Sequence, residues 1–444
     1  MLAVVPDSAT LHQESKSGSL RYFRELLPSF NDYLGAKNTW RRDVVAGITV
    51  AIVALPLALA FGITTGAGAQ AGLITAIYAG LIAAVFGGSN YQVSGPTGAM
   101  TVILVPIVIK YGTQSLAPLG LVAGVIVVLM GATHCGGLIK KVPWPVMEGF
   151  TLGIALVIAL QQLPSALAAP GVSGPNTLIT AWRTFHAALV AGLHWISLFI
   201  VLFTLLIKFT YPKVAKKLKI RVHVPASFVA IVFASALVAL LSIHTPVIGS
   251  LPRSLFSHVS LTGTRIGISA LVIGAVQIAL LAAIESLLSA RVADQMVHIH
   301  DPAEGYKPNR ELVGQGLATI VSSMAGGMPA TGAIARTSVN IRAKGQSRIS
   351  AITHSIFLIL VVLLLNPVIS HIPTAALGAV LIGTSYRIAN PATLKEILKT
   401  TRLDAVTLLV TAVLVVALGL IWAIAITTAG YFLVTIIMKR VKKV

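Results

Sequence analysis

Long apolar stretches, separated by short polar or glycine-containing breaks, fill most of this chain. A helix that spans a membrane needs about 20 mostly apolar residues. Several stretches approach or meet that length: 44–62, 116–133, 196–207, 224–242 and 349–365. With the shorter apolar stretches between them, they predict about fourteen helical crossings, some of them half-length. The pattern therefore predicts an all-α polytopic membrane protein in a lipid bilayer.

Two breaks in the apolar pattern have nearly the same sequence. Residues 94–101 read SGPTGAMT and residues 328–336 read MPATGAIAR, so that Thr97 and Thr331 lie 234 positions apart. We place these breaks at the third and tenth crossings. Because they are separated by an odd number of crossings, the second half enters the membrane from the opposite side. The sequence therefore predicts two inverted repeats that interlock in one domain.

The two breaks predict a binding site for an anion. A backbone that stops being helical in hydrocarbon leaves polar groups unpaired at a cost of several kcal/mol each, unless they line a protein cavity. Thr97 and Thr331 are natural N-caps, and the glycine after each lets a ligand approach the first free amides of a half-helix. Two such positive helix ends facing one another would bind an anion. The alternative is that proline and glycine only kink ordinary transmembrane helices.

A basic residue follows the second break. Arg336 comes four residues after Gly332, one turn along the same face of the tenth crossing. Its guanidinium would strengthen the preference for an anion. The alternative is an arginine that snorkels toward the membrane surface.

Among the 13 acidic residues, Glu285 stands in the middle of an apolar span. A carboxylate there costs roughly 2.5 to 3.5 kcal/mol on insertion, so we expect it to face the interior and act in coupling. Ser289 lies four residues later on the same helical face. Reversible protonation of Glu285 would let a proton travel with the anion. The alternative is a structural ion pair with a neighbouring basic group.

Composition supports the membrane assignment, and the placement of charge gives a topology. Hydrophobic residues make up 56% of the 444 and charged residues 10%, too few to coat a soluble globule of this size. The net charge of +20 could indicate nucleic-acid binding. However, we place only Lys110, Arg183, Arg253 and Arg265 outside, and the other basic residues gather after even-numbered crossings. This positive-inside bias predicts a multi-pass protein of the cytoplasmic (inner) membrane with both termini cytoplasmic, and no nucleic-acid partner.

The chain is therefore expected to divide into a cytoplasmic N-terminal segment (1–40), a transmembrane transporter domain (41–438) and a short cytoplasmic tail (439–444). Within the first segment, apolar residues between 20 and 34 recur near helical spacing beside basic ones, which is typical of a helix on the membrane face. A disordered tail is the alternative.

Several function classes lack support. No Gly-x-x-x-x-Gly-Lys-Ser/Thr loop occurs, so ion gradients and not nucleotide hydrolysis should drive transport. The sequence His298-Ile299-His300-Asp301 has no second ligand set for a metal, and no nucleophile-base pair indicates an enzyme. We therefore expect no enzymatic activity, no cofactor and no metal site.

Ordered motifs run from about Arg42 to the C-terminus: Ala54-Leu55-Pro56 with Phe61-Gly62, Phe86-Gly87-Gly88, Gly95-Pro96-Thr97-Gly98, Glu285-Ser286-Leu287-Leu288 with Val292-Ala293-Asp294, Asn309-Arg310-Glu311-Leu312-Val313-Gly314-Gln315-Gly316, and Arg336-Thr337-Ser338-Val339-Asn340. In this order they resemble the SulP anion permease family, known in animals as solute carrier family twenty-six. The resemblance implies a uracil-permease-like fold of seven plus seven inverted-repeat crossings. It also implies a core (crossings one to four and eight to eleven) that moves like an elevator against a gate (five to seven and twelve to fourteen), and a homodimer.

Carried over by motif, the resemblance places the anion against Thr97 and the amides of Gly98, Ala99, Gly332 and Ala333. Leu57 and Phe61 would wall the pocket. In sodium-coupled bicarbonate members the position of Glu285 is an aspartate, that of Ser289 a threonine, and that of Ile334 a hydroxyl-bearing residue. The longer acid and the apolar Ile334 of this chain favour protons over sodium. The chain shows no C-terminal STAS domain, which we interpret as a member without one or a shortened sequence.

These observations predict a secondary active transporter that moves a small inorganic oxyanion or dicarboxylate, of the sulfate, bicarbonate and fumarate class, together with protons. A sodium-bicarbonate symporter and a passive anion channel are the alternatives. A nucleobase permease of similar architecture is weakened by Arg336, which suits an anion better than a neutral base.

Overall fold

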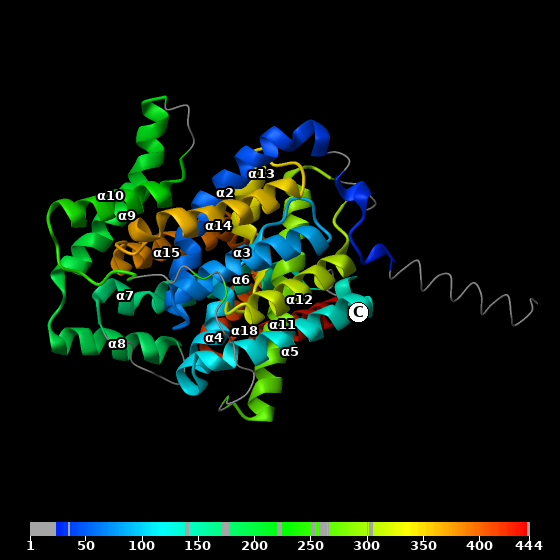
Figure 1. Ribbon diagram of the computed structural model, residues 1–444. Coiled ribbons are helices and arrows are strands. Elements are labelled where there is room, and N and C mark those ends of the chain that lie inside the picture. The colour runs from blue at the N-terminus through cyan, green and yellow to red at the C-terminus, as the bar shows by residue number, and fades with distance from the viewer. Residues whose placement is uncertain are drawn as a thin grey trace, which may run out of the picture.

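The computed structural model describes residues 24–33, 36–137, 142–169, 177–219, 224–249, 266–299 and 305–441, together with residues 254, 256, 264 and 301. The described part is almost entirely helical (Figure 1). Its elements, in chain order, are η1 Phe30–Tyr33, α2 Ala36–Thr64, α3 Ala69–Phe86, β1 Ser94–Gly95, α4 Gly98–Tyr111, η2 Thr113–Ser115, α5 Leu116–Ala132, α6 Trp144–Gln161, α7 Leu163–Leu167, α8 Thr177–Ala191, α9 Trp195–Lys217, α10 Ala226–Leu240, α11 Ile268–Met296, α12 Pro308–Met324, β2 Thr331–Gly332, α13 Ile334–Arg342, α14 Ile349–Ile369, α15 Thr374–Ile388, α16 Pro391–Leu398, α17 Arg402–Leu418 and α18 Leu420–Val441.

Many of these helices are suited to a bilayer. Among the described residues, 8 helices are long and apolar enough to cross a membrane, and two shorter apolar helices, Gly98–Tyr111 and Ala226–Leu240, join them. The chain is thus a multi-pass membrane protein. The count of about fourteen crossings stays a prediction, because it depends on helices shorter than a full span.

The helices pack in two groups that are in contact with one another. In the first group, α12 packs on α5 and α3, and α14 packs on α2 and α3. Helix α11 belongs to the same group and packs on α5, α13 and α4. In the second, α15 packs on α9, α6 and α10, and α17 packs on α6 and α18. The contacts between the groups include those of α4 with α6 and of α15 with α2.

Strands β1 and β2 bring the two sequence breaks together. They pair antiparallel, with Ser94 opposite Gly332 and Gly95 opposite Thr331. The pairing gives backbone groups that have left the helical ladder new partners inside the protein, which a membrane interior requires. The starts of α4 and α13 are therefore neighbours although they are far apart in sequence.

The motif at the start of α12 has a packing role. The Glu311 carboxylate accepts hydrogen bonds from the Gly88 and Ser89 amides at 2.8 and 3.1 Å. A side chain on Gly314 would collide with the Gly87 backbone, so this glycine permits the close crossing of α12 and the end of α3.

The N-terminal segment reaches the same region through Asp32. The Asp32 carboxylate pairs with the Arg310 guanidinium at 2.7 Å. Partial burial raises the pKa of Asp32, but the hydrogen bond from Arg310 and other contacts outweigh that effect, and its pKa is lowered. Residues 1–23 of the predicted N-terminal segment and residues 442–444 of the predicted tail lie outside the described residues.

Candidate functional site

At the start of α4, two backbone amides have no acceptor among the described residues. Thr97 is the N-cap, and its hydroxyl accepts a hydrogen bond from the Met100 amide at 3.4 Å. The first amide bonded along the helix is that of Thr101, to the Thr97 carbonyl at 3.2 Å. The Gly98 and Ala99 amides precede it and have no acceptor within the described part of the chain. They carry the partial positive charge of the helix end, as the sequence predicts.

The start of α13 differs from this expectation. The N-cap is Ala333 and not Thr331, because Thr331 and Gly332 belong to β2. The Gly332 amide donates to the Ser286 hydroxyl at 2.9 Å, and the Ala333 amide donates to the Val93 carbonyl at 3.0 Å. Both amides expected to face the anion are thus bonded to protein.

The amides that lack an acceptor in α13 come later. The first amide bonded along this helix is that of Thr337, to the Ala333 carbonyl at 2.9 Å. The Ile334, Ala335 and Arg336 amides precede it and, among the described residues, have no acceptor. The free end of α13 is therefore shifted by two residues from the position that the Thr-Gly-Ala match with α4 predicts.

Glu285 joins the two breaks. One of its carboxylate oxygens accepts hydrogen bonds from the Thr97 hydroxyl at 2.9 Å and from the Thr331 hydroxyl at 2.8 Å. The two threonine hydroxyls are themselves 3.4 Å apart. Among the described residues, no basic group comes within ion-pair distance of Glu285. The carboxyl group is held by neutral donors from both halves.

Arg336 ties α13 to the first break. Its side chain is 1% exposed, so it does not snorkel to the surface. One guanidinium nitrogen donates to the Pro96 carbonyl at 2.9 Å, and another lies 3.5 Å from the Ser94 carbonyl. The positive charge therefore stays beside the starts of both half-helices.

A cavity of about 90 Å³ lies in front of these groups. Its lining includes most residues predicted from the sequence: Leu57, Phe61, Thr97, Gly98, Ala99, Glu285, Ala333 and Arg336. Two predicted residues lie outside it. Gly332 faces Ser286, and the Ser289 hydroxyl lies 3.2 Å from that of Thr337 in the packed interior. The cavity has room for several waters or a small solute, but not for a drug-sized ligand.

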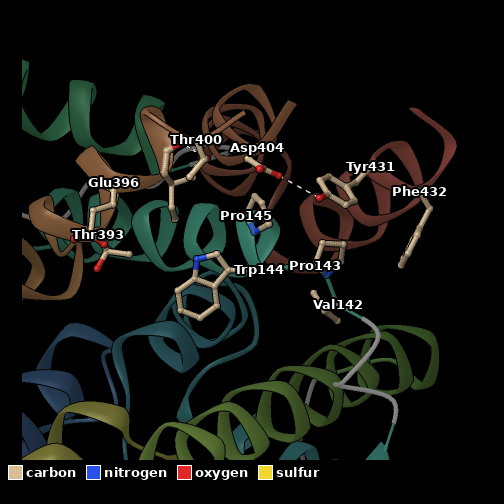
Figure 2. A pocket seen from close by; sticks show the side chains of 11 residues that line it. Val142, Pro143, Trp144, Pro145, Thr393, Glu396, Thr400, Asp404, Tyr431 and Phe432 are labelled. Atoms are coloured by element: carbon tan, nitrogen blue, oxygen red, sulfur yellow. Dashed lines mark hydrogen bonds between the residues drawn. The ribbon is translucent and has the colours of Figure 1, made fainter. Parts of the chain in front are cut away.

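A larger cavity, of about 540 Å³, lies between the starts of α6 and α17 and helices α16 and α18 (Figure 2). Its lining contains Glu396 and Asp404, and the Tyr431 hydroxyl donates to Asp404 at 3.1 Å (Figure 2). Among the described residues that line this cavity there are two carboxylates and no basic side chain, which disfavours an anion there. The size of a cavity therefore does not by itself identify the anion site.

Comparison with known proteins identifies the family. The sequence model of the sulfate permease family matches residues 40–411. The chain belongs to the sulfate permease family. Among its relatives, "Putative sulfate transporter YvdB" of Bacillus subtilis is 33% identical over 393 residues, which are 87% of this chain and 72% of that protein. "Bicarbonate transporter BicA" of Picosynechococcus is 28% identical over 363 residues, 77% of this chain and 60% of that protein.

Two solved structures have the same fold as this chain. The transmembrane domain of the cyanobacterial bicarbonate transporter BicA matches with a TM-score of 0.78 and 27% identity over 87% of this chain and 97% of that one. SLC26A9 matches with a TM-score of 0.80 over 99% of this chain and 72% of that one, and at 17% identity the likeness concerns the fold alone. The predicted uracil-permease-like, inverted-repeat fold is thereby confirmed.

Sequence reasoning missed one wall of the sulfate permease cavity. Phe150, Ile154 and Ile158 of α6 and Thr384 and Ile388 of α15 close the side opposite the half-helix starts. The four-residue spacing on α6 places its three side chains on one face. However, such an apolar stripe also occurs on any packed membrane helix, so the sequence alone carried no specific signal.

Proposed function

We propose that this sulfate permease family member is a secondary active transporter that moves a small oxyanion or dicarboxylate together with protons. The two relatives named above are described as a "Putative sulfate transporter" and a "Bicarbonate transporter", which supports an anion of this size. The proposal rests on one observation more than any other: a carboxyl group and unpartnered amides from both breaks lie around one cavity.

The lining of the cavity favours an anion. Among the described residues, the amides of Gly98, Ala99, Ile334 and Ala335 have no acceptor. They lie at two helix starts, where the helix dipole adds partial positive charge. The buried Arg336 adds a full charge behind them. Because these donors are fixed before the ligand arrives, an oxyanion can replace its hydration shell without reorganising the protein.

Glu285 supplies the coupling. An ionised carboxylate about 4 Å from an anion would cost about 4 kcal/mol of repulsion at an effective dielectric constant of 20. The anion therefore binds more tightly when Glu285 is protonated, and by linkage the anion favours the proton. A proton that enters with each anion would then let a pH gradient drive uptake.

The bicarbonate relatives favour one alternative, a sodium-bicarbonate symporter. The likeness to BicA is substantial in both sequence and fold. Sodium prefers oxygen ligands, and Glu285, Thr97 and Thr331 could supply three. Ile334, at the position where sodium-coupled members carry a hydroxyl, supplies none. We therefore propose protons as the coupling ion.

The two helix groups suit alternating access. The half-helix starts belong to α4 and α13, and the opposing wall belongs to α6 and α15. We infer that the first group is the core, the second the gate, and that sliding of the core carries the anion across the membrane. We further propose that the protein acts as a homodimer in the cytoplasmic membrane, with both termini cytoplasmic.

An uptake screen in proteoliposomes tests the function. Sulfate, bicarbonate and fumarate are each offered with an imposed proton or sodium gradient. We expect at least one anion to accumulate above equilibrium with the proton gradient and not with sodium. Accumulation that follows sodium would support the symporter alternative, and flux that no second ion can concentrate would support a channel.

The same assay tests the coupling residue. Glu285→Gln keeps the hydrogen-bonding shape but cannot ionise, so we expect anion exchange to continue while proton-driven accumulation is lost. Glu396→Gln, an exposed acid on α16, is the matched control and should behave as the unmodified protein. Full accumulation by Glu285→Gln would contradict the coupling role.

A further inference from the structure

A second basic residue is buried, in the opposite helix group. Lys208 lies within the membrane-spanning helix α9 and is 4% exposed. Its ammonium donates to the Val380 carbonyl at 2.5 Å and to the Thr384 hydroxyl at 2.7 Å, both on α15. Figure 1 shows α9 beside α15, and the two helices are in contact. Lys208 therefore joins two helices of the proposed gate.

The ammonium has no negative partner. Both of its acceptors are neutral, and no carboxylate of the described chain lies within ion-pair distance of it. Arg387, a neighbouring side chain that acts electrostatically on Lys208, is also positive. A buried charge without a counter-charge costs several kcal/mol. An anion that came close to this ammonium would supply the counter-charge that the described chain does not.

The lysine lies directly behind the cavity wall. Thr384, which accepts the hydrogen bond from Lys208, lines the cavity that contains Thr97 and Glu285. Gly383 makes room for the lysine, because a Cβ there would come within 2.9 and 3.0 Å of the Cδ and Cε atoms of Lys208. The stem of the side chain thus follows a groove on α15 that ends at Thr384.

We propose that Lys208 is a positioning residue whose missing counter-charge is the transported anion, held through the Thr384 hydroxyl. This inference rests on the proposed function of the cavity. The Thr384 hydroxyl now donates to the Val380 carbonyl at 2.7 Å. When an anion arrives, the hydroxyl can turn and donate to it instead, while the Val380 carbonyl keeps its hydrogen bond from Lys208. The anion would then be bound by amides on one side and by this pair on the other.

This arrangement predicts that the gate contributes to affinity. The half-helix starts travel with the anion, whereas Lys208 stays with α9 and α15. Its charge therefore stabilises the anion only while the half-helix starts face this part of the gate. Removing the charge should raise the KM for the anion more than it lowers kcat.

The test compares Lys208→Gln, Lys208→Arg and Thr384→Val with the unmodified protein in proteoliposomes. Glutamine can still donate to the Val380 carbonyl but carries no charge, and arginine keeps the charge. Initial uptake is measured against sulfate and bicarbonate concentration, and the melting temperature in detergent reports stability. Lys213→Gln, which removes a charge from an exposed position of α9, is the matched control.

We expect Lys208→Gln and Thr384→Val to raise KM roughly tenfold, as one partly screened charge at this range would. Lys208→Arg should stay within about threefold of the unmodified protein, and melting temperatures should be preserved. An unchanged KM for Lys208→Gln would overturn the inference while the proposed function stands. An equal rise in KM for Lys208→Gln and Lys208→Arg, together with lower melting temperatures, would also overturn the inference, because it would indicate a structural role for Lys208. If the unmodified protein moves none of the anions, the proposed function fails and this inference with it.

Discussion

The starts of α4 and α13 carry the same Thr-Gly-Ala sequence but differ in structure. At α4 the helix begins directly after Thr97, whose hydroxyl caps it. At α13 the extended backbone continues for two more residues, and Thr331 binds Glu285 without capping the helix. The difference arises because Ser286 and the Val93 carbonyl bond the Gly332 and Ala333 amides. Tertiary partners, and not the local motif, therefore determine which amides are left free.

The two starts also differ in charge. Arg336 of α13 corresponds in the repeat to Val102 of α4, so only the second half supplies a buried guanidinium. The first half supplies the Pro96 and Ser94 carbonyls that the guanidinium contacts. The two helix starts are therefore held together by a side chain that only one of them supplies. We therefore expect matched substitutions at the starts of α4 and α13 to change stability and uptake by different amounts.

The largest effect is expected from Arg336→Met. It leaves the buried Pro96 carbonyl without its donor, at a cost of about 1 to 3 kcal/mol, and removes the charge beside the cavity. We expect a lower melting temperature and uptake reduced by roughly 100-fold. Arg336→Lys, which keeps the charge with fewer donors, should be intermediate. Arg342→Met, at the exposed end of the same helix, is the control, and normal stability and uptake in the Arg336→Met variant would refute this role.

A smaller effect is expected from Thr97→Val and Thr331→Val. Both remove one hydrogen bond to Glu285, but only the first also removes a helix cap, which is worth about 1 kcal/mol. The Thr97 variant should therefore melt at a lower temperature than the Thr331 variant, while uptake falls several-fold in both. Thr97→Ser should restore stability. A greater loss of stability in the Thr331 variant would mean that the two starts are not capped as described.

Sequence reasoning predicted the parts of the site that depend on pattern. The apolar period predicted helices, the matched breaks predicted two neighbouring half-helix starts, and the lone acid in an apolar span predicted that Glu285 would face the interior. These inferences rest on the free-energy cost of placing unpaired amides and lone charges in lipid, a cost that applies to every membrane protein.

The rest depended on contacts that no local pattern encodes. The two-residue shift at α13 follows from Ser286 and Val93, which are distant in sequence and chemically ordinary. Lys208 resembled one more basic residue near a membrane surface until the structure placed it behind Thr384. The α6 residues that line the cavity have the same apolar side chains as any packed membrane helix. Only the three-dimensional packing of α6 makes them a cavity wall.

The central claim is that unpartnered amides at the two helix starts bind the anion, and Ile334→Pro tests it most directly. Ile334 is the first residue of α13, where proline fits the helix and removes only an amide hydrogen that has no protein acceptor among the described residues. Ala333, with φ −101° and ψ 109°, already has the extended backbone that a following proline requires.

Sulfate and bicarbonate affinity is compared between Ile334→Pro and Ile334→Ala, which loses the side chain but keeps the amide. We predict that the proline variant binds the transported anion at least about tenfold more weakly than the alanine variant, at equal melting temperature, because one hydrogen bond to a charged ligand is lost. Equal affinity in the two variants would contradict the account.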